Sequence, residues 1–216
     1  MKLAAAILLA ATAIAGPVQS PLHAEAHRET RDEAVLSAAH LAKGVTTGTM
    51  ASVFPESAGV NAGTLVRELG AQCSPARSPV CPDGDAPCHP NGSLTFISMP
   101  ISLMTRNIKA NDGRATYTLQ TPLEKGVSEY GRPRVAFIGN LTVLNDIDVA
   151  ERERLATCYT KYHPDARWWL PDDPRGAHTA HWARLDINDI YYIGGFGTTG
   201  YIGHLPLDKY AQAMEA

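Results

Sequence analysis

The chain has 216 residues, of which 19 are lysine or arginine and 22 are aspartate or glutamate, giving a net charge of −3. The basic residues are dispersed and form no stripe, which excludes nucleic acid as the main partner. A chain of this length buries about 70% of its unfolded surface on folding, so we expect a substantial hydrophobic core.

The first residues have the pattern of a secretory signal peptide. Lys2 precedes 13 uncharged residues from Leu3 to Ala15, which end in small side chains. This combination is typical of a cleaved leader, and the apolar run is too short to span a bilayer. We predict a leader over residues 1–15. The cut is left open between residues 15 and 26, because Ala24-Glu25-Ala26 offers a second site.

The remaining residues, 27–216, are predicted to form one domain of a secreted or lumenal protein, either extracellular or in a vacuole or lysosome. No later stretch is long and apolar enough to cross a membrane. The protein is therefore expected to fold in an oxidising compartment, where paired cysteines form disulfides.

The N-terminal half is predicted to hold a helix, strands and a long loop. Apolar residues at helical spacing, stopped by Gly44, predict a helix over residues 27–43. The Thr- and Val-rich residues 45–53 predict a first strand, followed by a turn region over 54–63. Residues 64–71 fit either a strand or a helix. Residues 73–92 contain five prolines and predict a loop.

The C-terminal half alternates strands with helices. Its patterns predict strands over 93–99, 115–120 and 135–144, and two short strands or one bent strand over 182–186 and 189–193. They predict helices over 101–109, 146–163 and 206–214, with a loop over 164–174. Several strands with peripheral helices in one chain predict an α+β fold whose sheet is closed or nearly closed.

The four cysteines are predicted to form one or two disulfides. None of them stands in the C-x-x-C spacing of a zinc site, so no metal is expected. Three lie within the 73–92 loop, which favours a local bridge there, although four cysteines allow three pairings. The candidates are Cys73, Cys81, Cys88 and Cys158.

Two N-glycosylation sequons follow from the same secretory prediction, at Asn91 and Asn140. Asn91 stands between Pro90 and Gly92 in the predicted loop, where a glycan meets no obstacle. Asn140 lies inside a predicted strand, and its modification requires that face of the sheet to be solvated. We therefore favour Asn91.

The segment Gly195–Gly200 matches the G-x-G-x-x-G dinucleotide fingerprint and follows a predicted strand. The fingerprint needs a following helix and an acidic residue about 20 positions further on. Only 16 residues follow Gly200, so we interpret the glycines as a bend close to a ligand or to another backbone segment.

Two histidines, His178 and His181, stand three residues apart, but on a strand they would point to opposite faces, which disfavours chelation. No H-E-x-x-H, G-x-S-x-G or P-loop motif occurs, and no serine or cysteine stands in an activating context. The motifs therefore identify no catalytic residue.

A set of motifs in the second half resembles the CREG family of secreted glycoproteins, which have the fold of pyridoxamine 5′-phosphate oxidase. The resemblance covers roughly residues 30–212 and is poorest over the cysteine-rich loop. It rests on the ordered segments His163 to Trp169, His178, Trp182 to Ile187, Ile190 to Gly197 and Tyr210, with Ser98 to Asn107 and Ala115 to Leu119 upstream. It implies an FMN-binding split β-barrel with peripheral helices, and a homodimer.

The wider superfamily implies a cofactor site, because its members bind FMN in the dimer groove through hydroxyls and basic side chains. Heme-utilisation relatives have S-x-L-S-x-H-T-x-N at the turn that corresponds to Ile101–Asn107. Met104 stands where that pattern has His, which counts against a heme-handling protein. The resemblance implies that FMN, if bound, would contact Ser102, Thr105, Arg106, Asn107, Gly195 and Phe196. A guanidinium such as that of Arg106 suits a phosphate.

Two hypotheses follow. The first is a secreted, non-catalytic, dimeric CREG-like glycoprotein, because CREG proteins generally lack flavin. The second is an FMN-dependent oxidoreductase of the same fold. The Gly194-Gly195-Phe196-Gly197 turn keeps the second open, since it is nearer to flavin-competent relatives than to the mammalian CREG pattern. If flavin is absent, a protein partner is expected instead.

Overall fold

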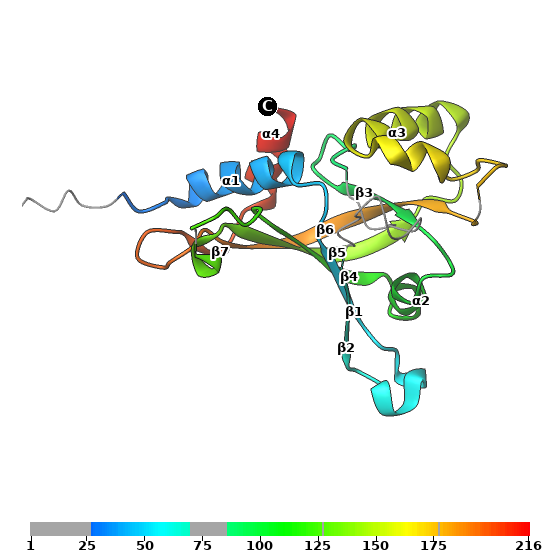
Figure 1. The fold of residues 1–216 in the computed structure, drawn as a ribbon, viewed down its shortest axis with the longest axis horizontal. Coiled ribbons are helices and arrows are strands. Elements are labelled where there is room, and N and C mark those ends of the chain that lie inside the picture. The colour runs from blue at the N-terminus through cyan, green and yellow to red at the C-terminus, as the bar shows by residue number, and fades with distance from the viewer. Residues whose placement is uncertain (1–26, 70–85, 127, 177) are drawn as a thin grey trace, which may run out of the picture.

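The computed structural model describes residues 27–69, 86–126, 128–176 and 178–216 (Figure 1). These residues form an antiparallel sheet with helices packed around it. The strands are β1 (Thr49–Val53), β2 (Leu65–Leu69), β3 (Leu94–Ser98), β4 (Arg114–Gln120), β5 (Arg134–Val143), β6 (His181–Ile193) and β7 (Ile202–His204). The helices are α1 (Arg31–Gly44), α2 (Leu103–Ala110), α3 (Val149–Tyr162) and α4 (Leu207–Glu215), with short 3₁₀ turns η1 (Glu56–Asn61), η2 (Glu129–Gly131) and η3 (Pro164–Trp168).

The strands are ordered β2-β1-β4-β5-β6-β3, and β7 pairs with the far end of β6. All pairings are antiparallel. The two longest strands, β5 and β6, pair from Arg134 opposite Ile193 to Val143 opposite Ala183, with one irregularity where Asn188 has no partner opposite the Ile138–Gly139 step. The two predicted strands of 182–193 are therefore one strand with a bulge.

Side-chain capping determines the residue at which three of the helices begin. Thr30 accepts the Glu33 backbone N–H while the Glu33 carboxylate accepts the Thr30 N–H, a capping box that begins α1 at Arg31 rather than at the predicted residue 27. Ser102 caps α2 and Asp148 caps α3 in the same way, each accepting an N–H three residues on. The turn between α2 and β4 uses positive φ angles at Asp112 and Gly113, as the Asn-Asp-Gly sequence predicts.

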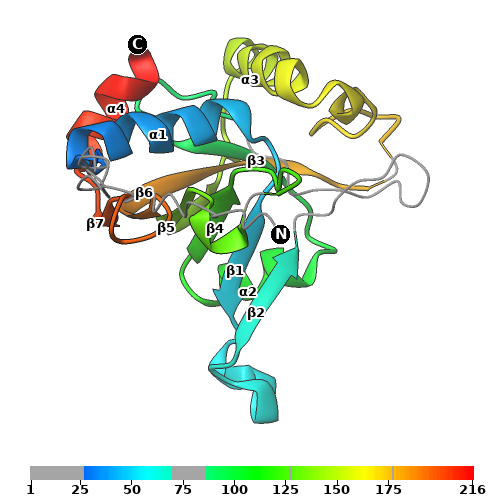
Figure 2. The same ribbon diagram turned by 60° about the vertical axis from the view of Figure 1, so that its left-hand side comes forward.

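Helices α1 and α4 cover one face of the sheet, and α3 lies beside them over the β3 edge (Figures 1 and 2). The main core lies between α1, α4 and the sheet, and includes the buried rings of Tyr117, Phe137 and Tyr210. A second cluster lies under α3, where Leu155 and Tyr159 pack against Trp182. Figure 1 shows α2 on the other side of the sheet, next to the arm formed by β1 and β2. The predicted α+β class is confirmed.

The disulfide differs from the local bridge that the loop favoured. Cys88 is bonded to Cys158, 70 residues away, and so joins the segment before β3 to α3. Arg154 reinforces this join, because its guanidinium donates to the Cys88 carbonyl at 2.6 Å and pairs with Glu151. Cys88 is thus excluded from a bridge within its own loop. Cys73 and Cys81 lie outside the described residues, and their pairing stays a prediction.

Among the described residues, none of the helices is long and apolar enough to cross a membrane. The predicted leader lies outside these residues.

Candidate functional site

A cavity of about 550 Å³ lies between α2 and the ends of β3, β5 and β6. Its volume is in the range of small-molecule and cofactor sites. Apolar side chains and a set of polar ones share the lining. The lining residues are Ser98, Pro100, Thr105, Arg106, Ile108, Lys109, Asp112, Gly113, Asn140, Leu141, Thr142, Val143, Asn145 and His181. We call this cavity the α2 pocket.

Helix α2 supplies a hydroxyl and two cations to the α2 pocket. Its N-cap at Ser102 fixes the first turn, and the Thr105 hydroxyl then lies 3.2 Å from that of Ser98 at the end of β3. Arg106 and Lys109 are three residues apart, so they share a helix face. Both side chains are exposed, line the pocket and have no hydrogen-bond or ion-pair partner in the described part of the chain. Their charges are available to an anion.

Strand β5 forms the opposite wall. Its irregularity places Gly139 against the Asp186 carbonyl, where a Cβ would overlap that oxygen, so only glycine fits. The next residue, Asn140, donates from Nδ2 to the Asp112 carbonyl and accepts from Asn188. The first bond holds the wall of the α2 pocket against the turn that follows α2, and the second ties it to the bulge of β6.

His181 is the imidazole of the α2 pocket. It begins β6 and stands directly opposite Ser98 in the β3–β6 register, so both side chains lie on the same face of the sheet. A neutral imidazole can accept or donate a proton, and it can also bind a metal. The pocket therefore combines hydroxyls, two cations, one titratable ring and the Asp112 carboxylate, which pairs with Arg114, with apolar walls.

The structure brings together part of the predicted cofactor set. Thr105 and Arg106 line the α2 pocket, and Ser102 caps the helix that carries them. Asn107 is on the buried side of α2, and its Nδ2 has no partner in the described part of the chain. Met104 is also buried, in the main core, rather than lining the pocket.

Gly195 and Phe196 lie elsewhere in the chain. They form part of the connection between β6 and β7, where a Cβ on Gly195 would be 2.8 Å from the Gly131 carbonyl and the Phe196 ring lies beside Gly131. Neither lines the α2 pocket. Within one chain they do not reach the α2 pocket, and their contact with a cofactor in the groove of a dimer stays a prediction.

Sequence reasoning missed several pocket residues, chiefly Lys109, Asn140 and His181. Helical spacing from Thr105 and Arg106 would have identified Lys109. The sequence marks Asn140 only as a sequon, whereas in the structure its amide is half-buried and hydrogen-bonded at both ends. The sequence offers His181 only as a neighbour of His178, and its place in the pocket follows from strand register. The other sequon residue, Asn91, is exposed in a turn.

Comparison with known proteins agrees with this fold. The family model described as the CREG β-barrel matches residues 29–212. The chain belongs to this family. The resemblance and the split-barrel fold predicted from the sequence are therefore confirmed. No curated protein matches this CREG-family chain.

Two solved structures show how far the CREG-family chain has diverged. It is similar to a heme-binding protein from Mycobacterium smegmatis, with a TM-score of 0.59 and 14% identity over 86% of this chain and 61% of that one. It is also similar to a protein of unknown function from Agrobacterium tumefaciens, with a TM-score of 0.54 and 21% identity over 85% of this chain and 62% of that one. The chain spans about three fifths of both proteins, and identities this low show the fold alone.

Proposed function

We propose that this CREG-family chain is a secreted, dimeric binding protein that holds FMN in the α2 pocket. The observation that carries the proposal is the convergence of Thr105, Arg106 and Lys109 on one cavity, with both cations lacking a partner in the described part of the chain. A phosphate dianion is the ligand that such a set of donors suits best. The proposal takes secretion and dimerisation from the first sequence-based hypothesis and FMN binding from the second.

The residues of the α2 pocket fit the two ends of this cofactor. Arg106, Lys109 and the Thr105 hydroxyl would hold the phosphate. Pro100, Leu141 and Val143 offer apolar walls for a flat ring system. When bound, FMN supplies one- and two-electron redox chemistry, while the protein binds and orients it.

His181 favours a second candidate, the FMN-dependent oxidoreductase. Its imidazole lies in the same pocket and beside Ser98 across the strand pair, where it can hold or release a proton during a reaction of a bound ligand. The first candidate binds flavin without turnover. The second requires that flavin bound to the protein be reduced by a nicotinamide or another donor and then reoxidised.

A dimer is proposed because the family resemblance implies one and because the face of the sheet away from α1 has an apolar hollow. This hollow, of about 430 Å³, is lined in part by Ala51, Val53 and Ile138, and the last two are more than a third exposed. Asn140 lines both this hollow and the α2 pocket, so the two adjoin. Light scattering of the purified protein tests the dimer, since a monomeric mass at micromolar concentration would contradict it.

Fluorescence titration of FMN tests the binding proposal. We expect saturable quenching by the wild-type protein. Arg106→Ala should weaken binding about 10- to 150-fold, the range for a lost hydrogen bond to a charged group. The matched control is Arg167→Ala, which removes an exposed arginine that does not line the pocket and whose contact is with the Trp168 ring. The proposal fails if wild-type protein ignores FMN or if both variants bind it equally well.

A further inference from the structure

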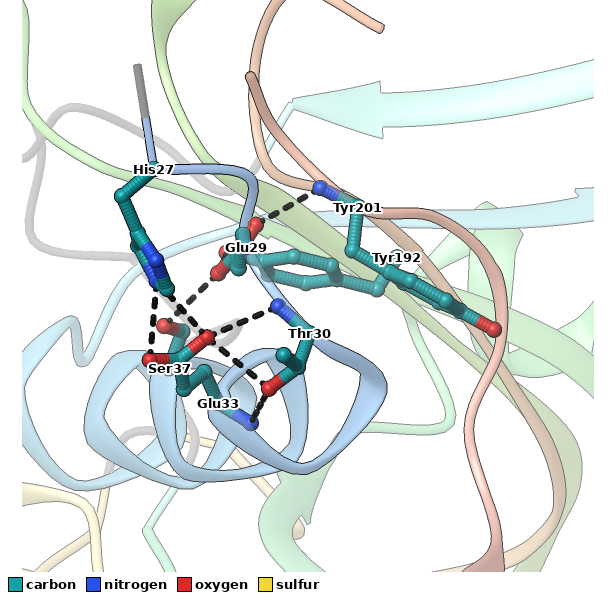
Figure 3. Close-up of polar contacts among 7 residues, drawn as sticks. All are labelled: His27, Glu29, Thr30, Glu33, Ser37, Tyr192 and Tyr201. Carbon is teal, nitrogen blue, oxygen red and sulfur yellow. Dashed lines mark hydrogen bonds and ion pairs between the residues drawn. The ribbon is translucent and has the colours of Figure 1, made fainter. Parts of the chain in front are cut away.

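The glycine-rich connection between β6 and β7, Gly194–Tyr201, has a role that the α2 pocket does not explain. Figure 3 shows the N-terminal segment passing over this connection, with the Glu29 side chain directed toward Tyr192 and Tyr201. The Glu29 backbone N–H donates to the Thr199 carbonyl at 2.7 Å. The segment before α1 is thus bound to the β6–β7 connection through both its backbone and a carboxylate.

The Glu29 carboxylate accepts three hydrogen bonds. The Tyr201 backbone N–H donates to Oε2 at 2.9 Å, and the Tyr192 hydroxyl donates to Oε1 at 3.0 Å. The Ser37 hydroxyl, in the second turn of α1, donates to Oε1 at 3.1 Å. All three donors are neutral, and no cation among the described residues pairs with this carboxylate. Its negative charge is therefore stabilised by hydrogen bonds, which are stronger for a charged acceptor than for a neutral one.

The glycines make room for this carboxylate. A Cβ on Gly194 would overlap Glu29 Oε2, so the carboxylate fills the space that a side chain would occupy. A Cβ on Gly200 would lie 2.7 Å from the Gly194 carbonyl carbon, so the two ends of the bend touch through their backbones. Of the glycines in the dinucleotide-fingerprint match, Gly195 and Gly200 are explained by close backbone contacts, to Gly131 and to Gly194, and not by a bound nucleotide.

Tyr192 forms the floor of this bend. Its side chain is completely buried, and burial is the main reason that its pKa is raised to about 12, with the nearby Glu29 charge acting in the same direction. The phenol therefore stays neutral and able to donate at physiological pH. If Glu29 were removed, the Tyr192 hydroxyl would lose its acceptor and become an unsatisfied buried donor. Ser37 or a water molecule would then have to replace the carboxylate as acceptor.

We propose that the Gly194–Tyr201 connection is a carboxylate-binding site and that Glu29 is its built-in ligand. The shape of the β6–β7 connection then depends on an N-terminal segment about 165 residues away in sequence. Each predicted leader cut, between residues 15 and 26, keeps Glu29 on the protein. Trimming beyond Glu29 would open the site to a carboxylate from solution or from another chain. This inference is independent of FMN binding in the α2 pocket.

A double-mutant cycle tests the pairing of Glu29 with Gly194. Gly194→Ala should destabilise the wild-type protein, because the new methyl group displaces the carboxylate. In a Glu29→Ala background the same substitution should cost much less, since the remaining close neighbour is a Tyr192 ring carbon at 3.1 Å. Equal costs in both backgrounds, measured by chemical denaturation, would overturn the proposal.

Amide hydrogen exchange measures the site itself. We expect Glu29→Ala to speed exchange at the Tyr201 amide at least about tenfold, which corresponds to about 1.4 kcal/mol. Glu29→Gln retains one acceptor and should give an intermediate rate, which keeps the test usable if the alanine variant folds poorly. The matched control is Glu33→Ala, which removes a neighbouring carboxylate that caps α1 and should leave Tyr201 unchanged.

Rescue by a small carboxylate tests the chemical class. Formate or acetate, added to the Glu29→Ala variant, should slow Tyr201 exchange back toward the wild-type rate, and chloride at equal ionic strength should not. Equal effects of formate and chloride, or unchanged Tyr201 exchange in the Glu29→Ala variant, would overturn the assignment of a carboxylate site.

Discussion

The α2 pocket and the Glu29 site differ in how their charged groups are partnered. In the α2 pocket, Arg106 and Lys109 line a cavity without partners in the described part of the chain. At the β6–β7 connection, the Glu29 carboxylate is satisfied by three donors and enclosed by glycines. A satisfied charge contributes to the fold, whereas an unpaired charge beside a cavity is available to a ligand.

This contrast separates two measurable properties. Substitutions at the Glu29 site should lower the free energy of unfolding and leave FMN affinity unchanged. Substitutions of the unpaired cations in the α2 pocket, Arg106 and Lys109, should lower FMN affinity and leave the free energy of unfolding unchanged. A third region, the disulfide beneath α3, provides a reference for changes that affect folding alone.

The largest expected effect is the loss of the Cys88–Cys158 disulfide. It closes a segment of 70 residues, for which chain entropy predicts a stabilisation of about 4 kcal/mol. The Cys88→Ala/Cys158→Ala variant should therefore melt about 10 °C lower, a shift that calorimetry measures. FMN affinity at a temperature well below melting should be unchanged. An unaltered melting temperature would show that the packing of Leu155 and Tyr159 alone holds α3.

An intermediate effect is expected from single substitutions in the two regions, Glu29→Ala and Arg106→Ala. Glu29→Ala should destabilise the protein by about 2 kcal/mol, the scale of a hydrogen-bonded charge, with no change in FMN dissociation constant. Arg106→Ala should weaken FMN binding and leave the free energy of unfolding unchanged. Denaturation and titration of both variants measure the two properties side by side. If either variant changed both properties strongly, the two regions would be coupled and the contrast would be wrong.

The smallest expected effect at neutral pH is that of His89, next to the disulfide, whose contribution to stability changes only in acid. Burial chiefly, and then the charges of Arg154 and Arg184, lower the pKa of His89 to about 4. His89 is protonated near pH 6.5 in the unfolded chain but only near pH 4 in the folded protein. Stability from this residue is therefore complete above pH 6.5 and is lost as the pH falls through that window.

His89→Gln should flatten the stability profile between pH 6.5 and pH 4, as measured by urea denaturation across that range. His27→Gln is the control, because that imidazole is exposed on the surface and paired with Glu33. If the free energy of unfolding depended on pH in the same way in the wild type and in His89→Gln, the lowered pKa of His89 would not be the cause of the acid sensitivity.

Local sequence signals predicted most of the elements but not all of their ends. The Asn111-Asp112-Gly113 turn ends α2 as its sequence predicts, whereas the Ser102 cap begins the helix at Leu103, two residues after the predicted start. The start of α1 was placed four residues early. Residues 27–30 contain good helix formers, but Thr30 caps the helix and Glu29 binds the β6–β7 connection.

The candidate site was predictable only where its residues are neighbours in sequence. Thr105 and Arg106 come from one helix and were identified from a family pattern. His181 reaches the α2 pocket through the register of β6 against β3, and Cys158 reaches Cys88 through the packing of α3. Neither contact has a local signature, since both depend on how distant segments pair.

The central claim is that the ligand binds in the α2 pocket, and amide NMR of the labelled protein during FMN addition tests it most directly. We predict that resonances of Thr105, Arg106, Lys109 and His181 shift and saturate together, while those of Gly194–Tyr201 stay in place. Shifts confined to Gly195, Phe196 and their neighbours would contradict the account and would support the sequence-based cofactor assignment of those two residues.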